Sequence, residues 1–266
     1  MGVPGGVYKR YAPAALSAAR GERGQLGGSG DLEADIALCA KQTIEPLFRK
    51  YLPRTGKILE AGAGRGRWVF YLRRKGYDVV GLELAQSDVD AAKAFDPTVP
   101  MEHGDVLKCP YADRSIAAVI SLGVMEHFEE GPQAALAEVR RILRPGGLLL
   151  VTVPTRDFMR VILFNRMKTA ENFYRRIRNV PLEFEEYRYS RRQFALLLRA
   201  AGFKILEMAP DDFHPPLNMG LYTDSRFLRK PGSKWELNAA GNLINDTLGT
   251  VSPWLVCSGT LWVCRA

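Results

Sequence analysis

The sequence predicts an α/β protein built on a doubly wound, mostly parallel sheet. Three observations support this prediction: short apolar runs alternate with amphipathic segments, a glycine-rich turn joins the first such pair, and acidic residues end several runs. Parallel strands are buried on both faces, so they show continuous apolar runs. The expected strands are residues 57–61, 78–83, 101–106, 115–122, 148–154, 203–208 and 260–264.

Amphipathic segments between the strands predict the helices. The clearest covers residues 190–201, where Ser190 can cap the first turn and Gly202 can end the last. A helical pattern also follows Asp31 as its cap and ends at Pro53. The remaining expected helices are residues 68–76, 87–95 with Ser87 as cap, and 133–143.

The composition excludes several classes of protein. With 266 residues, 47% hydrophobic and 25% charged, the chain is expected to be soluble and globular. It has no apolar run near the ~20 residues of a membrane helix, and no apolar core follows Lys9 and Arg10 as in a secretory signal. Scattered cysteines and histidines predict a reduced cytoplasmic protein with no metal site. The cysteines are Cys39, Cys109, Cys257 and Cys264.

The net charge of +8 favours an anionic partner, and much of the excess lies between residues 156 and 192. This basic and aromatic segment could be a solvated helix face, or an anion site for the substrate. It could also contact lipid headgroups, with residues 158–164 as its apolar side. Nucleic acid is the least favoured partner because no RNA-binding accessory domain is evident. Nothing in the sequence indicates an oligomeric state.

We expect one domain over residues 31–266, preceded by a flexible tail over residues 1–30 that is rich in Gly, Ala and Ser. Two insertions, at about 155–190 and 211–258, are too long for plain connections. They should form lids over the carboxyl ends of the strands, where doubly wound folds bind ligands. A tail that closes over the ligand through Tyr8 and Tyr11 is the alternative to a flexible tail.

The turn after the first strand indicates which ligand is bound. Residues 60–66 are Glu-Ala-Gly-Ala-Gly-Arg-Gly, whereas a dinucleotide fingerprint needs the third glycine at the position of Arg67. This spacing disfavours an NAD-dependent oxidoreductase. Glu60 would repel a pyrophosphate but can accept hydrogen bonds from a cationic amino group. The ligand is therefore expected to carry an amino acid; a turn with incidental glycines is the alternative.

The E-x-G-x-G-x-G pattern resembles the first motif of the class I S-adenosylmethionine-dependent methyltransferases. Residues 123–128, Gly-Val-Met-Glu-His-Phe, are similar to a run that many small-molecule methyltransferases carry after the fourth strand, and Arg144-Pro-Gly-Gly before the fifth strand is typical of the family as a whole. The Asn/Asp-Pro-Pro-Tyr/Phe motif of nucleic-acid amino methyltransferases is replaced here by Ser-Leu-Gly-Val-Met-Glu-His. The resemblance covers about residues 55–210 and the last strand. It implies a seven-stranded sheet with an antiparallel last strand, and S-adenosylmethionine as cofactor.

The resemblance also assigns cofactor contacts. Glu83 ends the second strand and would accept hydrogen bonds from the ribose hydroxyls. Asp105 would accept from the adenine amino group, and Val106 would pack on the ring. The predicted cofactor-binding residues are Glu60, Ala61, Gly62, Ala63, Gly64, Gly66, Arg67, Glu83, Leu84, Asp105, Val106 and Leu122.

Methyl transfer from a sulfonium needs in-line positioning, exclusion of water and, for a hydroxyl acceptor, removal of a proton. His127 is the candidate base and Glu126 would orient it; a purely structural histidine is the alternative. The predicted substrate-binding residues are Tyr187, Arg188, Tyr189 and His214, the last also as a second base.

The sequence thus predicts an enzyme that transfers a methyl group to a small-molecule acceptor or to one linked to a lipid or glycan, by in-line displacement and at oxygen. The acceptor is expected to be anionic or lipid-linked, with peripheral membrane contact and no membrane-spanning segment. Two alternatives stay open: an RNA- or protein-directed methyltransferase, and a non-catalytic S-adenosylmethionine-binding relative. Intact Glu60, Gly62, Gly64, Glu83 and Asp105 favour an enzyme.

Overall fold

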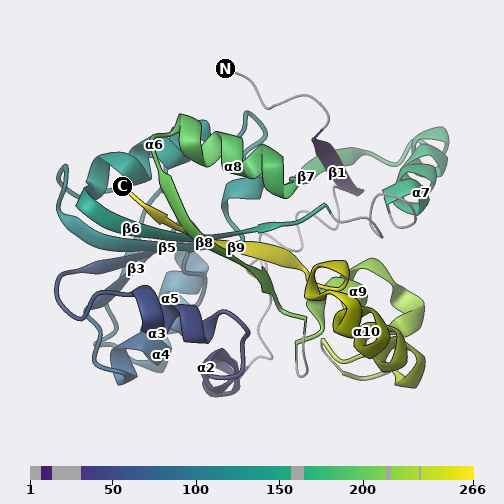
Figure 1. Ribbon diagram of the computed structural model, residues 1–266, viewed down its shortest axis with the longest axis horizontal. Coiled ribbons are helices and arrows are strands. Elements are labelled where there is room, and N and C mark those ends of the chain that lie inside the picture. The colour runs from purple at the N-terminus through teal and green to yellow at the C-terminus, as the bar shows by residue number, and fades with distance from the viewer. Residues whose placement is uncertain (1–6, 14–30, 157–164, 214–216, 234) are drawn as a thin grey trace.

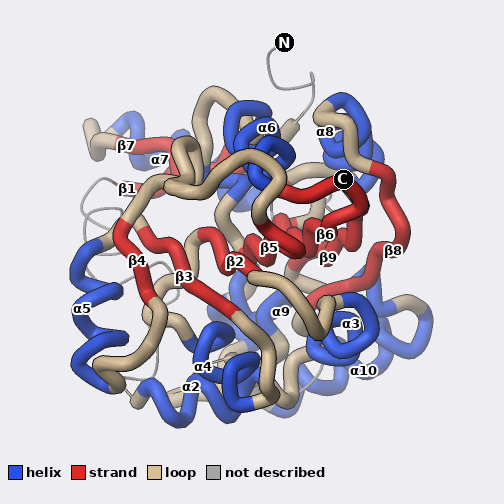
Figure 2. Tube along the Cα trace, turned by 90° about the vertical axis from the view of Figure 1, so that its left-hand side faces the viewer, coloured by secondary structure: helices blue, strands red, loops and turns tan. Residues whose placement is uncertain are grey.

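A seven-stranded sheet in the order β4-β3-β2-β5-β6-β9-β8 forms the centre of the molecule (Figure 2). The computed structural model describes residues 7–13, 31–156, 165–213, 217–233 and 235–266. The neighbours from β4 to β6 pair in parallel, and β9 runs antiparallel to both of its neighbours. This confirms the predicted fold class. The strands are β2 (Ile58–Ala61), β3 (Val79–Glu83), β4 (Met101–His103), β5 (Ile116–Leu122), β6 (Leu143–Pro154), β8 (Lys204–Asp211) and β9 (Gly259–Arg265).

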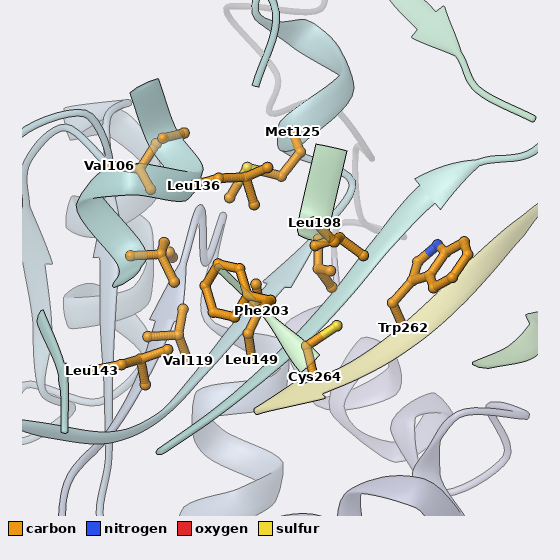
Figure 3. Close-up of a cluster of buried hydrophobic side chains, with 14 of the residues drawn as sticks. Val106, Val119, Met125, Leu136, Leu143, Leu149, Leu198, Phe203, Trp262 and Cys264 are labelled. Carbon is orange, nitrogen blue, oxygen red and sulfur yellow. The ribbon is translucent and has the colours of Figure 1, made fainter. Parts of the chain in front are cut away.

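Helices cover both faces of this sheet (Figure 1). On β9, Trp262 and Cys264 enter one apolar cluster while Leu261 and Val263 enter the other, as the two-residue period of a strand requires. Figure 3 shows the first cluster, in which Leu136 and Leu198 pack with Phe203 and Trp262. The helices on that face are α6 (Gln133–Ile142) and α8 (Arg191–Ala200); those on the other are α2 (Leu32–Cys39), α3 (Glu45–Tyr51), α4 (Arg67–Arg74) and α5 (Gln86–Phe95).

The two predicted insertions contain secondary structure of their own at the end of the molecule where β6 finishes (Figure 1). A small apolar cluster of Leu221, Leu237 and Val256 stabilises the second insertion. That the insertions act as lids stays a prediction. The first holds α7 (Asn165–Ile177) and β7 (Leu182–Arg188); the second holds α9 (Met219–Asp224), η3 (Arg226–Leu228), α10 (Ala239–Val251) and η4 (Pro253–Leu255).

The prediction of a flexible tail is wrong for residues Tyr8–Pro13, which form strand β1 antiparallel to β7. Arg10 pairs with the carboxylates of Glu185 and Glu186, and the Tyr11 ring meets Phe184 edge-on. These partners are far away in the sequence, so composition alone could not indicate them. Residues 1–6 and 14–30 of the predicted tail lie outside the described residues.

Several helices begin or end at other residues than predicted. The single helix expected between Asp31 and Pro53 is two helices, α2 and α3, and Asp31 caps the first by accepting from the N–H groups of Glu33 and Ala34. Helix α5 follows Ala85 and is not capped by Ser87. Ser190 does cap α8, in a reciprocal capping box with Gln193.

Candidate functional site

The glycine turn between β2 and α4 adopts a conformation that excludes other residues. Gly62, Gly64 and Gly66 have φ values of 77°, 54° and 78°, in the left-handed region that favours glycine. A Cβ on Gly62 would overlap a methyl group of Val124, whereas a Cβ on Gly64 would meet no atom within 4 Å. The turn is therefore closed by packing at Gly62 and open at Gly64.

The carboxylate of Glu83 holds this turn from the neighbouring strand. One oxygen accepts the Gly64 N–H at 2.8 Å and the other accepts the Ala85 N–H at 2.9 Å. The ends of β2 and β3 are thus joined at the position where the resemblance expects the ribose. Leu84, the next residue, is exposed.

Glu60, at the end of β2, is 3% exposed, and its Oε2 has no hydrogen-bond partner among the described residues. Burial raises the pKa of this carboxyl to about 8, against the opposing effects of the Arg67 guanidinium and a backbone hydrogen bond from Val69. A buried carboxyl with a free oxygen is stabilised by a cationic donor. The amino group of a methionine moiety fits that requirement.

The predicted adenine contacts lie one strand further out. The sequence predicted a strand through residue 106, but β4 ends at His103, because the Asp105 side chain accepts the Leu107 N–H at 2.8 Å and starts a turn. Since Glu83 pairs with His103 in the sheet, Asp105 follows two residues beyond the level of Glu83. Val106 beside it is 8% exposed.

The other predicted cofactor-binding residues lie in or next to the glycine turn and at the end of β5. Ala61 and Ala63 are buried in the apolar clusters, and Leu122 is half-buried at the end of β5. Arg67 begins α4, and its positive charge partly opposes the burial that raises the pKa values of Glu60, Asp211 and Asp212. The structure thus brings the predicted residues from β2, β3, β5 and α4 to one end of the sheet; their binding roles stay predictions.

His127 lies in a short 3-10 turn, η1 (Met125–His127), after β5. Its Nδ1 is 2.7 Å from the backbone carbonyl oxygen of Glu185 in β7. A carbonyl oxygen can only accept, so this contact assigns a hydrogen to Nδ1 and leaves the lone pair of the neutral ring on Nε2. Glu126 lies further off, with its Oε1 4.0 Å from Nε2.

Glu126 is buried, and its Oε2 has no partner among the residues that the structure describes. Burial raises the pKa of this carboxyl well above its usual range, and the negative charges of Glu186 and Asp211 raise it further. Burial therefore favours the neutral form of Glu126. The contact with the Glu185 carbonyl orients His127, while the predicted orienting role of Glu126 stays a prediction.

Ion pairs between β1 and β7 were missed by the sequence analysis. Arg10 Nε is 2.8 Å from Glu185, and both Arg10 and the buried Arg188 contact the same oxygen of Glu186, at 3.0 and 3.1 Å. Burial alone would raise the pKa of Glu186, but Arg10, Arg188 and His127 together hold it at about 2. The aromatic and charged residues at 8–11 and 184–188 lack the strict alternation of a strand, so the local sequence carried little signal for this pair.

The two predicted substrate tyrosines are each 1% exposed. The Tyr187 hydroxyl donates to the Glu129 carbonyl at 2.7 Å, so this side chain is already satisfied. The Tyr189 hydroxyl has no partner among the described residues, and burial and the nearby Glu126 raise its pKa. Tyr189 therefore retains a hydroxyl that could bind an acceptor. His214 lies outside the described residues.

A buried acidic pair lies at the same end of the sheet: Asp211 is the last residue of β8, and Asp212 follows it. Gln42 donates to both oxygens of Asp212, at 3.1 and 3.3 Å. Burial and the neighbouring Asp212 raise the pKa of Asp211, which has an oxygen with no partner within the described ranges. No group of three or more His, Cys, Asp or Glu in the described chain could hold a metal ion.

This strand order, with a glycine turn and carboxylates at the ends of the first two strands, defines a Rossmann-like nucleotide-binding class. The family profile of the methyltransferase domain matches residues 33–208, about two thirds of the chain. The chain therefore belongs to this family of S-adenosylmethionine-dependent methyltransferases.

Individual relatives align with a smaller part of the chain than the family profile does. A probable S-adenosylmethionine-dependent methyltransferase of Mycolicibacterium smegmatis is 34% identical over 99 residues, which are 37% of this chain and 38% of that protein. A malonyl-[acyl-carrier protein] O-methyltransferase of Serratia marcescens is 33% identical over 94 residues, 35% of this chain and 36% of that protein. These matches thus span less than two fifths of each relative.

Among solved structures, a putative methyltransferase complexed with the Trm112 activator of Haloferax volcanii superposes with a TM-score of 0.56. The identity is 19%, and the match covers 93% of this chain and 96% of that one, so the likeness concerns the fold alone. Among the helices that the structure describes, none has the length and apolar character needed to cross a membrane.

Proposed function

We propose that this methyltransferase transfers the methyl group of S-adenosylmethionine to an oxygen atom of a small-molecule or lipid-linked acceptor. The observation that supports this most directly is the 2.7 Å contact between His127 Nδ1 and the Glu185 carbonyl. It leaves Nε2 with a lone pair at the carboxyl end of the strands, as a general base for a hydroxyl requires.

When bound, S-adenosylmethionine would supply an activated methyl group to the acceptor oxygen by in-line displacement and would leave as S-adenosylhomocysteine. His127 Nε2 would take the proton of the acceptor hydroxyl. The cofactor supplies an activated methyl group, so the protein has to position the two reactants and remove the proton. Glu60 would hold the amino group of the cofactor, Glu83 its ribose hydroxyls, and Asp105 its adenine amino group.

The choice of an oxygen acceptor requires a neutral His127, and two nearby carboxyl groups act on the ring differently. Burial favours the protonated form of Glu126, whose Oε1 is 4.0 Å from Nε2, whereas Glu186 is ionised and its charge favours the imidazolium. The name of the Serratia relative includes an O-methyltransferase activity, which agrees with this choice. An RNA or protein acceptor, or a non-catalytic cofactor-binding protein, is the alternative.

Mass spectrometry tests the proposal. The protein is incubated with methyl-labelled S-adenosylmethionine and, separately, with extracts of polar metabolites, lipids, RNA and protein. A labelled methyl ether or ester in the small-molecule or lipid fraction supports the proposal. Label only in RNA or protein, or cofactor binding without any labelled product, would overturn it.

The base is then tested with two variants of His127. His127→Gln retains an N–H group for the Glu185 carbonyl but has no basic nitrogen, so we expect kcat to fall roughly a hundredfold or more with little change in cofactor affinity. The kcat of His127→Ala should fall as far, and it should recover in part when imidazole is added. Full activity of the Gln variant would remove His127 as the base.

A further inference from the structure

Helix α7 carries an exposed apolar surface that the proposed reaction does not use. Phe173, Tyr174 and Ile177 are 66%, 55% and 65% exposed. Because successive helical residues are rotated by about 100°, these three side chains share one arc of the helix. Single exposed apolar residues are normal, but three on one arc indicate a contact surface.

Arginine residues adjoin this arc. By the same rotation Arg176 lies beside it, and Arg178 directly follows the last residue of the helix, Ile177; both arginines are exposed. The sequence contains no acidic residue between 172 and 182. An apolar stripe bordered by guanidinium groups is the pattern of a helix that lies in the interface of an anionic membrane, with its apolar side chains among the lipids and its cations at the headgroups.

The contacts of the aromatic rings argue against RNA as the partner. Arg178 lies over the Tyr174 ring at 4.9 Å, and Arg176 lies over the Tyr11 ring of β1 at 5.9 Å. Stacking platforms for bases need open ring faces, and these two rings each have an arginine on a face. Neither contact hinders shallow insertion of Phe173 and Ile177 into lipid.

Helix α7 is also linked to the candidate site. Asn172 Nδ2 donates to the Tyr11 carbonyl at 3.4 Å, and Arg10 in the same strand pairs with Glu185, whose carbonyl contacts His127. In Figure 1, α7 projects past the end of β6, on the same side of the molecule as α9 and α10. A membrane bound by α7 would therefore adjoin the acceptor side of the site.

We infer that α7 docks this protein on an anionic lipid surface. The docking depends on the surface of α7 alone. That the membrane also presents the acceptor, an amphipathic lipid with a methylatable hydroxyl, rests in addition on the function proposed above. Binding to vesicles and methyl transfer can fail independently, so the two proposals are distinguishable.

Sedimentation of the full-length protein with vesicles tests the docking. We expect binding to vesicles of phosphatidylglycerol and phosphatidylcholine at low salt, and much weaker binding to phosphatidylcholine alone. The pair Phe173→Ser and Ile177→Ser, and the pair Arg176→Glu and Arg178→Glu, should each lower the partition coefficient roughly tenfold or more. The matched controls Leu196→Ser on α8 and Lys93→Glu on α5, both at exposed positions, should stay within about twofold of the wild type.

Circular dichroism and calorimetric titration with S-adenosylhomocysteine, carried out on every variant, show whether the fold and the cofactor site are unchanged. The docking proposal is overturned if the wild type does not sediment with the anionic vesicles, or if the α7 pairs and the controls lose binding equally. It is also overturned if the α7 pairs abolish binding to a single-stranded RNA while vesicle binding persists.

Discussion

On the side of the site where we propose that the cofactor binds (the cofactor side), Glu60, the glycine turn and Glu83 belong to one strand–helix–strand unit. On the side proposed for the acceptor (the acceptor side), Arg10 meets Glu186 from 176 residues away, and His127 meets Glu185 from 58 residues away. Both sides place charged groups at the same end of the sheet. The difference is that the first side is held together by local sequence and the second by the pairing of distant strands.

Removal of Arg10 should have the largest effect, because the acceptor side depends on it. Arg10→Ala leaves Glu185 and Glu186 with one fewer guanidinium in a site where the three side chains are at most 14% exposed, and breaking such buried pairs costs about 3 kcal/mol or more. We expect faster hydrogen exchange of the amides in β1 and β7, and a lower kcat with unchanged cofactor affinity.

The pH dependence of this variant gives a second readout. The pKa of Glu186 is lowered to about 2, so its ion pairs contribute stability above its ordinary pKa of 4.5, and this contribution is lost as the pH falls towards 2. In Arg10→Ala the folded-state pKa of Glu186 should rise towards 4.5, so this loss should be smaller and complete at higher pH, which acid unfolding measures. Arg10→Lys is the control and should lie between the two. Unchanged exchange in β1 and β7 would contradict the role of the ion pairs.

Two glycines within one turn sharpen the comparison on the cofactor side. Gly62→Ala combines a left-handed backbone with an overlap at Val124 and should destabilise the protein by about 2–4 kcal/mol. Gly64→Ala meets no atom and should cost about 1 kcal/mol, yet its methyl group would occupy the open side of the turn. We therefore expect Gly64→Ala to lose cofactor affinity out of proportion to stability.

Thermal unfolding and calorimetric titration separate these effects. If Gly64→Ala binds S-adenosylmethionine with the affinity of the wild type, the open side of the turn is not the cofactor position. That outcome would contradict the assignment of a packing role to Gly62 and a cofactor-binding role to Gly64.

Glu60 should make stability depend on pH near neutrality. Its pKa is about 8 in the folded protein and ordinarily 4.5, so the folded state retains a proton that the unfolded state has lost. The contribution of protonated Glu60 to the free energy of unfolding is fully present below pH 4.5. It declines as the pH rises towards 8, by roughly 2–3 kcal/mol between pH 5 and pH 7. Glu60→Gln should remove this decline. The measurement is the difference between the stability curves of the wild type and of Glu60→Gln against pH. In that difference the similar trends from Glu126 and Asp211 cancel.

The same carboxyl should report cofactor binding. A cationic amino group beside Glu60 favours its ionised form, so S-adenosylmethionine should release a proton when it binds at pH 7. Titration calorimetry in two buffers of different ionisation enthalpy counts that proton. Equal heats in both buffers would mean that the amino group binds elsewhere.

The sequence predicted the sheet, most of the helices on its faces and the glycine turn because each depends on neighbouring residues: apolar runs, caps and glycine spacing. It predicted His127 from a local motif but not the Glu185 carbonyl that assigns its tautomer. Strand β1 was missed since its partner is β7, and pairing between distant strands leaves no local periodicity. Asp211 and Asp212 were similarly hidden, because only the fold shows that they are buried next to Arg67 and Glu126.

The smallest expected effect belongs to Glu83, which is half-buried and joins the two strands of the cofactor side. Glu83→Gln keeps the shape but has only one accepting oxygen for the Gly64 and Ala85 N–H groups, and it loses the charge. We expect stability to fall by about 1 kcal/mol and S-adenosylmethionine affinity to fall roughly five- to tenfold. Glu102→Gln, an exposed carboxylate on β4 that accepts from Tyr111, is the matched control. Equal affinities of the two variants in a calorimetric titration would show that Glu83 supports the turn without contacting the ribose.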